Sequence, residues 1–339
     1  MEFEIVVQTL AQYQAKGYFP SAVCRVFRGQ ETLYECTLGD TTADTWYDLA
    51  SVSKLMTTTL NLNLIGAGRF ALDTPVLQLL PVQQMGAITQ SRLAAVTVYQ
   101  LMTHTSGLLA WYPFYADGAP FYAALEHALA GSKPEVQMVY SDLNYMLLGE
   151  IFRNQSGLSL PEGLAQYIKA PLDIADMGYG VAAQYPCAPS SYGNPIEQRM
   201  CAERGFAFDG WRSNDLPVCR TCNDGNAHYF WQDIAGHAGV FATAEALAKL
   251  GQFYLTTQKA IFVQATEELN QGRGIGFDKT DTFPAGCGHT GFTGTSLWVS
   301  RAHDIGAVIL TNKFYQHETP PGSSNEFRRA VHEAILAQC

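Results

Sequence analysis

Residues 296–310 read SLWVSRAHDIGAVIL and predict two adjacent β-strands, over 296–300 and 305–310. Two more β-like runs lie near the other end of the chain, over residues 22–27 and 32–38. The four residues between these runs, 28–31, predict that they form a hairpin. Because strands gather at both ends of the chain, we expect one sheet built from both ends.

Helical patterns flank and separate these strands. Apolar residues recur at helical spacing over residues 3–17, 51–65, 243–255 and 327–336. Residues 66 to 235 read mostly as helices and long loops, with the clearest helices over 143–152 and 160–168. The stretch 184–226 is rich in Pro, Gly, Ser, Asn and Cys, which predicts irregular structure there.

The predicted fold class is therefore α/β of the α+β kind. An antiparallel sheet formed by both chain ends is flanked by the terminal helices and carries an inserted, mostly helical lobe. We expect residues 1–65 and 236–339 to form the sheet domain and residues 66–235 to form the helical and loop-rich lobe.

Composition excludes several classes of protein. The 339 residues carry a net charge of −10, whereas a protein that binds nucleic acid or an anionic membrane needs a basic face. No run of about 20 apolar residues predicts a membrane span. The acidic start MEFE does not resemble a secretory signal, so we expect a cytoplasmic protein, or an extracytoplasmic one if a leader has been removed. The sequence does not indicate which oligomeric state the protein adopts.

The sharpest chemical signal is Ser51-Val52-Ser53-Lys54. At helical spacing Ser51 and Lys54 share one face, so the lysine amine can reach the serine hydroxyl. A serine is a weak nucleophile without an adjacent base, and a lysine serves as that base only where burial or a cationic neighbour lowers its pKa. The alternative is an ordinary surface pair, because four-residue patterns of this kind arise often by chance.

Two further stretches bring polar groups. Tyr140-Ser141-Asp142 directly precedes the predicted helix 143–152, where a phenol facing a cleft can pass a proton from serine to a leaving group. Capping of that helix by Ser141 or Asp142 is the alternative. Residues 288–294 read GHTGFTG, and such a strand edge admits a substrate and offers an N–H to an oxyanion, unless it is a plain turn.

The order of these three features resembles the penicillin-recognising serine hydrolases, which include class C β-lactamases, D,D-carboxypeptidases, D-aminopeptidases and related esterases. Other family-like stretches are DLASVSK at residues 48–54, LMTHTSGL at 101–108, residues 140–149, and GHAGVF at 236–241. The resemblance spans about residues 20–312 and implies a β-lactamase/transpeptidase-like fold.

The resemblance implies a serine hydrolase of the peptidase or esterase type, acting without a cofactor. Ser51 would form the acyl-enzyme, Lys54 and Tyr140 would share the proton transfers, and the N–H groups of Ser51 and Phe292 would form the oxyanion hole. The partner would be a small-molecule or peptide substrate: a D-amino-acid peptide, a small ester or a β-lactam. The alternatives are a β-lactamase proper and a non-catalytic penicillin-binding sensor or scaffold.

The substrate-binding residues implied are Asp142, His289, Thr290, Gly291 and Phe292, with His289 and Thr290 holding a carboxylate or polar tail. Asp142 stands where many members carry asparagine, and an ionised aspartate only accepts hydrogen bonds. His289 stands where many β-lactamases carry lysine, and a histidine is mostly neutral at pH 7. Both departures favour esters and D-amino-acid peptides over β-lactams.

The remaining sequence signals are weaker evidence for function. A zinc site formed by Cys187, Cys201, Cys219, Cys222 and His228 matches no standard spacing, so free thiols and no metal are expected. His104 and His237 are expected to make structural hydrogen bonds, and Asp224 and Asn226 to border the cleft or cap a loop. The absence of G-x-S-x-G disfavours an α/β-hydrolase, and H-E-x-x-H and Walker A motifs are also absent.

Overall fold

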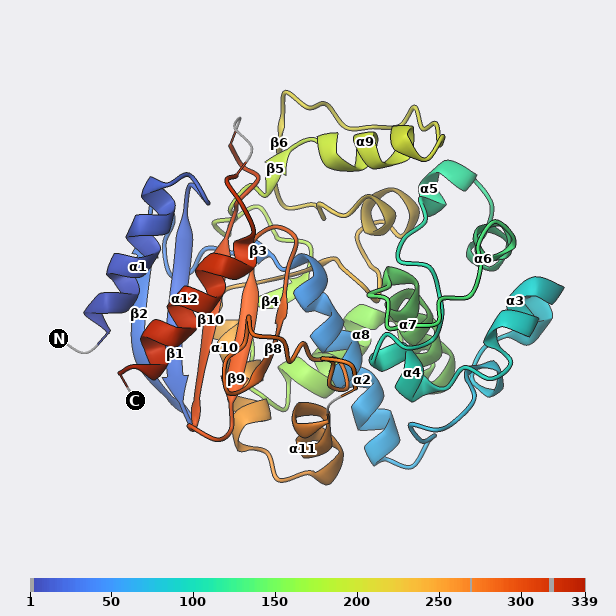
Figure 1. Ribbon diagram of the computed structural model, residues 1–339, viewed down its shortest axis with the longest axis horizontal. Coiled ribbons are helices and arrows are strands. Elements are labelled where there is room, and N and C mark those ends of the chain that lie inside the picture. The colour runs from blue at the N-terminus through green and yellow to red at the C-terminus, as the bar shows by residue number, and fades with distance from the viewer. Residues whose placement is uncertain (1–2, 269, 317–319, 339) are drawn as a thin grey trace.

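The computed structural model describes residues 3–268, 270–316 and 320–338. Its main sheet has the strand order β2-β1-β10-β9-β8, with every neighbouring pair antiparallel. The strands are β1 Ala22–Arg28, β2 Glu31–Leu38, β8 Cys287–Thr290, β9 Ser296–Ser300 and β10 Ile305–Thr311. Strands from the two chain ends lie side by side where β1 pairs with β10 (Figure 1), so the predicted sheet is confirmed.

Helices cover both faces of this sheet. The terminal helices α1 (Glu4–Ala15) and α12 (Ser324–Leu336) lie together on one face, and α10 (Ala244–Thr256) lies on the other (Figure 1). Successive side chains of a strand point to opposite faces, and β10 follows this rule. Ile309 packs with the terminal helices, whereas Val308 and Leu310 belong to the core on the α10 side. Both faces are thus buried, which is why β10 is apolar up to its last residue, Thr311.

The remaining helices lie between the strands of the main sheet in the sequence. They are α2 Ser53–Gly66, α3 Ala87–Leu93, α4 Val98–Met102, α5 Phe114–Asp117, α6 Phe121–Ala130, α7 Asp142–Ser156, α8 Leu160–Leu164, α9 Pro195–Glu203 and α11 Ala260–Glu267. Short 3-10 turns cover Ala50–Val52, Val76–Gln78 and Val82–Gln84, and π turns cover Ala165–Lys169 and Asn226–Phe230.

Two elements join the sheet to the helical part. Helix α2 is buried along most of its length and packs against α7. A small sheet with the order β3-β7-β4 pairs Tyr47–Asp48, Val240–Ala242 and Met177–Tyr179. These contacts hold the start of α2 and the start of α7 next to one another. The division at residues 65 and 236 stays a prediction.

One stretch differs from its prediction. Residues 184–226 were expected to be irregular, yet they contain α9 and the two-stranded sheet of β5 (Ser191–Tyr192) and β6 (Pro217–Val218). Helix α9 buries only Cys201, so it lacks the apolar stripe by which a core-facing helix is recognised. Among the described residues, no helix is both long and apolar enough to cross a membrane.

Candidate active site

Ser51 lies in the 3-10 turn between β3 and α2, and Lys54 lies in the first turn of α2. Their spacing turns both side chains toward the same side, and the Lys54 Nζ is 2.8 Å from the Ser51 Oγ. The serine is partly exposed whereas the lysine side chain is fully buried. The pair is therefore a buried amine that holds an accessible hydroxyl.

The Lys54 amine has three oxygen partners, one for each proton of an ammonium group. Besides Ser51, its Nζ lies 2.8 Å from Asp142 Oδ1 and 3.2 Å from the carbonyl oxygen of His237. Burial by itself would lower the pKa of Lys54, but the Asp142 carboxylate and the Tyr140 phenol outweigh it and raise this pKa well above its ordinary value. Lys54 is thus an ammonium, whereas a lowered pKa was the condition for a lysine base.

Tyr140 and Asp142 come from the start of α7. The Ser141 hydroxyl donates to the carbonyl of Leu109 at 2.6 Å and caps no helix, and the Asp142 carboxylate is engaged with Lys54. The capping alternative for this stretch is therefore wrong. Two cations lie near the Tyr140 ring, with the Lys54 Nζ and the Arg273 Cζ each 5.0 Å from its centroid. Their positive charge stabilises negative charge that develops on the phenol oxygen.

The opposite wall is the sheet edge at β8. His289 is 2% exposed, and burial together with the charges of Lys54 and Arg273 holds its pKa well below the ordinary value, so the ring is neutral. Its Nδ1 lies 2.9 Å from the carbonyl oxygen of Thr290, which can only accept, so Nδ1 carries the proton. The Nε2 atom is then an acceptor, and no described residue donates to it.

Beyond β8 the chain turns at Gly291 and Phe292. A Cβ at Gly291 would lie 2.4 Å from the carbonyl oxygen of Leu49, so only glycine permits this approach to the nucleophile turn. The Phe292 side chain is 45% exposed, and its N–H has no hydrogen-bond acceptor within the described part of the chain. An N–H left open beside Ser51 is the geometry that an oxyanion donor requires.

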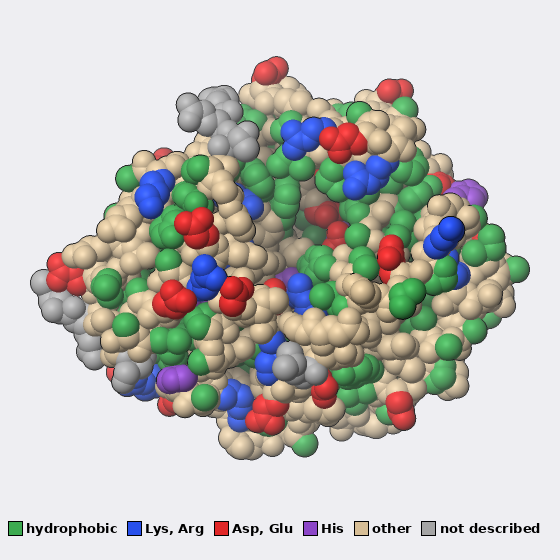
Figure 2. Space-filling view, viewed as in Figure 1, with side chains coloured by type: hydrophobic (Ala, Val, Ile, Leu, Met, Phe, Trp, Pro, Cys, Tyr) green, Lys and Arg blue, Asp and Glu red, His purple; other side chains and the backbone are tan. Residues whose placement is uncertain are grey.

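These groups line a single cavity of about 500 Å³. Its mouth is the hollow near the centre of the face in Figure 2, with acidic and basic side chains around it. Ser51, Tyr140, Asp142, His289, Thr290, Gly291 and Phe292 all line this cavity, and Lys54 lies beneath Ser51. The structure thus brings every predicted site residue to one place. Sequence reasoning missed Arg273 and Glu197, which also line it, because neither lies in a recognisable motif.

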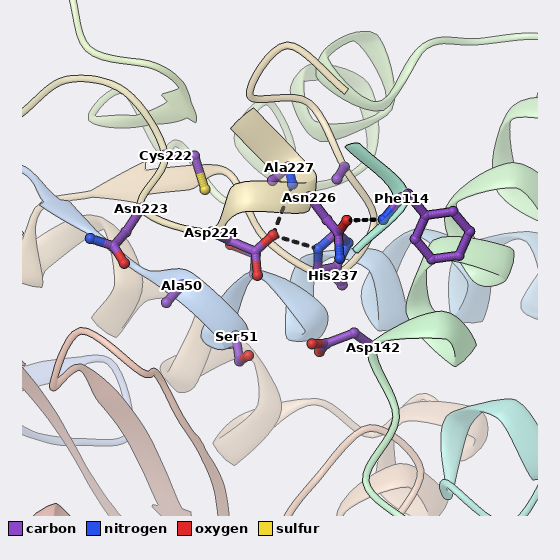
Figure 3. A network of polar contacts seen from close by, with 12 residues as sticks. Ala50, Ser51, Phe114, Asp142, Cys222, Asn223, Asp224, Asn226, Ala227 and His237 are labelled. Atoms are coloured by element: carbon purple, nitrogen blue, oxygen red, sulfur yellow. Dashed lines mark hydrogen bonds and ion pairs between the residues drawn. The ribbon is translucent and has the colours of Figure 1, made fainter. Parts of the chain in front are cut away.

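Asp224 lines this cavity, which is one of the two roles predicted for Asp224 and Asn226. Its Oδ1 lies 2.9 Å from the Nε2 of His237, whose carbonyl accepts from Lys54 (Figure 3). Burial would raise the pKa of Asp224, but His237 holds it below its ordinary value. Asn226 is buried and bonds Tyr112 and Phe114 instead, so it braces a loop.

The cysteine cluster does not assemble a metal site. Among the described residues, no group of three or more His, Cys, Asp or Glu side chains is placed to hold a metal ion. The Cys219 thiol donates to the carbonyl oxygen of Cys187 at 3.3 Å, and the neighbouring Cys187 thiol lowers the pKa of Cys219 to about 7. His104 accepts the Ser141 N–H at 3.1 Å, a structural bond of the expected kind.

Comparison with known proteins shows which family the chain belongs to. A model of the beta-lactamase family matches residues 6–326. The chain belongs to the beta-lactamase family. Among curated proteins it is 25% identical to an N-acetylmuramyl-L-alanine amidase of Bacillus subtilis, over 86% of this chain and 76% of that protein. It is 26% identical to a putative D-alanyl-D-alanine carboxypeptidase of Escherichia coli, over 80% and 70% of the two chains.

Solved structures of low sequence identity share the fold. A class C beta lactamase from Rhodobacter sphaeroides superposes with a TM-score of 0.70 at 17% identity and covers 98% of each chain. The hydrolase EstCE1, described as having promiscuous acyltransferase activity, superposes with a TM-score of 0.68 at 19% identity over 97% of each chain. The beta-lactamase/transpeptidase fold expected from the resemblance is confirmed.

Proposed function

We propose that this protein is a serine hydrolase that cleaves an ester or amide through an acyl-enzyme on Ser51. One observation carries the proposal. The buried Lys54 ammonium lies 2.8 Å from both the Ser51 hydroxyl oxygen and the Asp142 carboxylate, at the floor of the cavity. A structural lysine has no need of a partly exposed serine as a partner, whereas a nucleophile needs its oxygen held in one place.

Acylation begins when the Ser51 Oγ attacks the substrate carbonyl carbon and a C–O bond forms. The Lys54 amine has no lone pair to take the serine proton, because it is an ammonium. Tyr140, reacting as the phenolate, is the cavity-lining group that accepts this proton and becomes a neutral phenol, and the nearby cations Lys54 and Arg273 stabilise the phenolate charge. Lys54 contributes by donating to the Ser51 Oγ and stabilising its developing charge.

The carbonyl oxygen becomes negative as the tetrahedral intermediate forms. We assign its stabilisation to the N–H groups of Ser51 and Phe292. Collapse of the intermediate breaks the bond to the leaving group, which takes the proton from Tyr140. Water then attacks the acyl-enzyme through the same groups in reverse and releases Ser51.

The cavity favours some substrates over others. A neutral His289 offers no charge-assisted bond to the carboxylate of a β-lactam, and charge-assisted bonds are about twice as strong as neutral ones. Asp142 is held by Lys54 and presents no donor to a side-chain amide. Arg273, Lys313 and Arg328 are cationic residues that line the cavity and can attract a substrate carboxylate. We therefore propose a D-amino-acid peptide or a small ester as substrate, in line with the relatives named amidase and carboxypeptidase.

A substrate panel tests this proposal. We expect kcat/KM to be higher for p-nitrophenyl butyrate or a D-Ala-D-Ala peptide than for nitrocefin. His289→Lys should move the preference toward nitrocefin, because a lysine supplies the missing charge. A wild-type preference for nitrocefin would contradict the proposed substrate class. Full activity in Ser51→Ala would contradict the mechanism itself.

A further inference from the structure

The turn that carries the nucleophile has a strained backbone. Ala50 has φ of 46°, in the left-handed region that residues other than glycine rarely adopt. Ser51 follows it directly, so the strain sets the direction of the nucleophile and of its N–H. Backbone strain of this kind persists only where the surrounding structure holds it. The question is which group holds Ala50.

The carboxylate of Asp48 is that group. Its Oδ1 accepts the Ala50 N–H at 2.8 Å, and its Oδ2 accepts the N–H of Asn223 at 2.7 Å. Its backbone carbonyl accepts the hydroxyl of Thr293 at 2.7 Å. Asp48 is 3% exposed and does not line the cavity, so it makes these bonds without touching a substrate.

The three bonds reach three separate parts of the site. Ala50 is the nucleophile turn, Asn223 precedes the Asp224 that faces the cavity (Figure 3), and Thr293 follows the open N–H of Phe292. The buried side-chain carboxylate and the backbone carbonyl of Asp48 thus fix the serine relative to the cavity wall and to the second oxyanion donor.

We propose that Asp48 is a positioning residue whose ionised carboxylate holds the Ser51 turn in its reactive geometry. This inference rests on the proposed serine hydrolase mechanism. Both carboxylate oxygens accept an N–H, so both must be acceptors. A protonated carboxyl puts an O–H where one of these N–H groups points, and the turn loses one of its two anchors.

The surroundings of Asp48 put this switch within reach of ordinary assay conditions. Burial raises the pKa of Asp48, the two N–H bonds lower it and the carboxylates of Asp224 and Asp233 raise it, so that together they bring it to about 6. The groups that face Asp48 from other elements are the Asp224 and Asp233 carboxylates, the Cys222 thiol, and the Asn223 and Ala50 amides.

The sign of the pH effect separates positioning from folding. The pKa of Asp48 is raised in the folded protein above its ordinary 3.8, so its contribution to stability is present in acid and is lost as the pH rises to about 6. Activity should follow the opposite course, because only the ionised form holds the turn. Acidification through pH 6 therefore lowers the rate while the Asp48 contribution to stability grows.

Asp48→Asn is the direct test, because the amide keeps the size and loses one acceptor. We expect kcat on p-nitrophenyl butyrate to fall by about 10- to 100-fold, the range for a lost bond to a charged group, with KM changed little. The acidic limb of kcat/KM near pH 6 should disappear, since kcat/KM reports the groups of the free enzyme. Ala50→Gly in the same background should restore part of kcat, because glycine adopts a positive φ without strain.

Asp233→Asn is the matched control. It removes a neighbouring carboxylate but leaves both bonds to Asp48, so kcat should stay near wild type and the acidic limb should move to lower pH. If Asp48→Asn is too unstable to purify, this shift and the wild-type profile remain decisive. An unshifted limb in Asp233→Asn, or normal kcat with an intact limb in Asp48→Asn, overturns the inference. Absence of any Ser51 acyl-enzyme in the wild type overturns the proposed function instead.

Discussion

Asp142→Asn probes the ion pair at the base of the site. The side chain keeps its size, but the charge opposite the Lys54 ammonium disappears. The separation is 2.8 Å, the lysine side chain is 0% exposed and the aspartate side chain 19%. The substitution therefore leaves a buried cation with only the Ser51 hydroxyl, the His237 carbonyl and a neutral amide around it.

The magnitude follows from this geometry. Two unit charges at 2.8 Å attract one another by about 6 kcal/mol at an effective dielectric constant of about 20. Desolvation offsets part of this attraction, and removal of one partner of a buried pair costs about 3–5 kcal/mol. Because Asp142 keeps some contact with water, we expect a loss of about 3 kcal/mol in the free energy of unfolding at pH 7. Lys54→Met in the same chain should recover part of this loss, since no buried charge then remains unpaired.

The pH dependence has a definite sign. The folded-state pKa of Lys54 is raised above its ordinary 10.5, so the stabilisation by the pair is present below that value and is lost only at more alkaline pH. Without Asp142 the lysine loses its proton more readily, and the alkaline limb of kcat/KM should move to lower pH.

Urea unfolding followed by tryptophan fluorescence measures the loss of stability. Assays of kcat/KM on p-nitrophenyl butyrate across the alkaline pH range locate the alkaline limb of the pH profile. A variant within about 0.5 kcal/mol of wild type, as ordinary surface substitutions are, would refute the ion-pair reasoning. An unmoved alkaline limb would do the same.

Other outcomes follow from the same site. Lys54→Ala and Tyr140→Phe should each lower kcat/KM by at least about a hundredfold. The double variant should lose less than the product of the two losses, because Lys54 stabilises the same proton transfer that Tyr140 carries out; fully multiplicative losses in steady-state assays would argue for separate roles. His289→Lys should lower KM for a carboxylate-bearing β-lactam such as nitrocefin more than for a neutral ester; equal effects on both would show that His289 does not face the carboxylate. Cys219, with its pKa lowered to about 7, should react with iodoacetamide faster than the buried Cys222, as read by peptide mass mapping; preferential labelling of Cys222 would contradict this order.

Local patterns predicted the sheet and the helices that pack on it. Strand β10 is apolar up to Thr311, and α10 starts at the Thr243 cap, whose side chain accepts the Ala246 N–H. Such signals lie within a few neighbouring residues, so they can be seen in the sequence. Helix α9 could not be seen because it presents almost no apolar side to the core.

The features of the candidate site also divide into those that the sequence predicts and those that only the tertiary structure shows. Ser51, Lys54 and Tyr140 stand in short motifs with a resemblance behind them, and the structure brings them together. The protonation of Lys54 could not be predicted, because it depends on the Asp142 carboxylate that another helix brings against it. Arg273 lies between two glycines without any motif, so only the tertiary structure places it over Tyr140.

The central claim is that Ser51 is the nucleophile. Acid-quenched intact-mass measurement of the protein mixed with p-nitrophenyl butyrate tests it most directly, with peptide mapping to locate the label. We predict one butyryl group on Ser51, no label on Ser51→Ala, and turnover abolished in that variant while its unfolding curve stays close to wild type. A butyryl group on another residue, or turnover in Ser51→Ala within a few-fold of wild type, would contradict the claim.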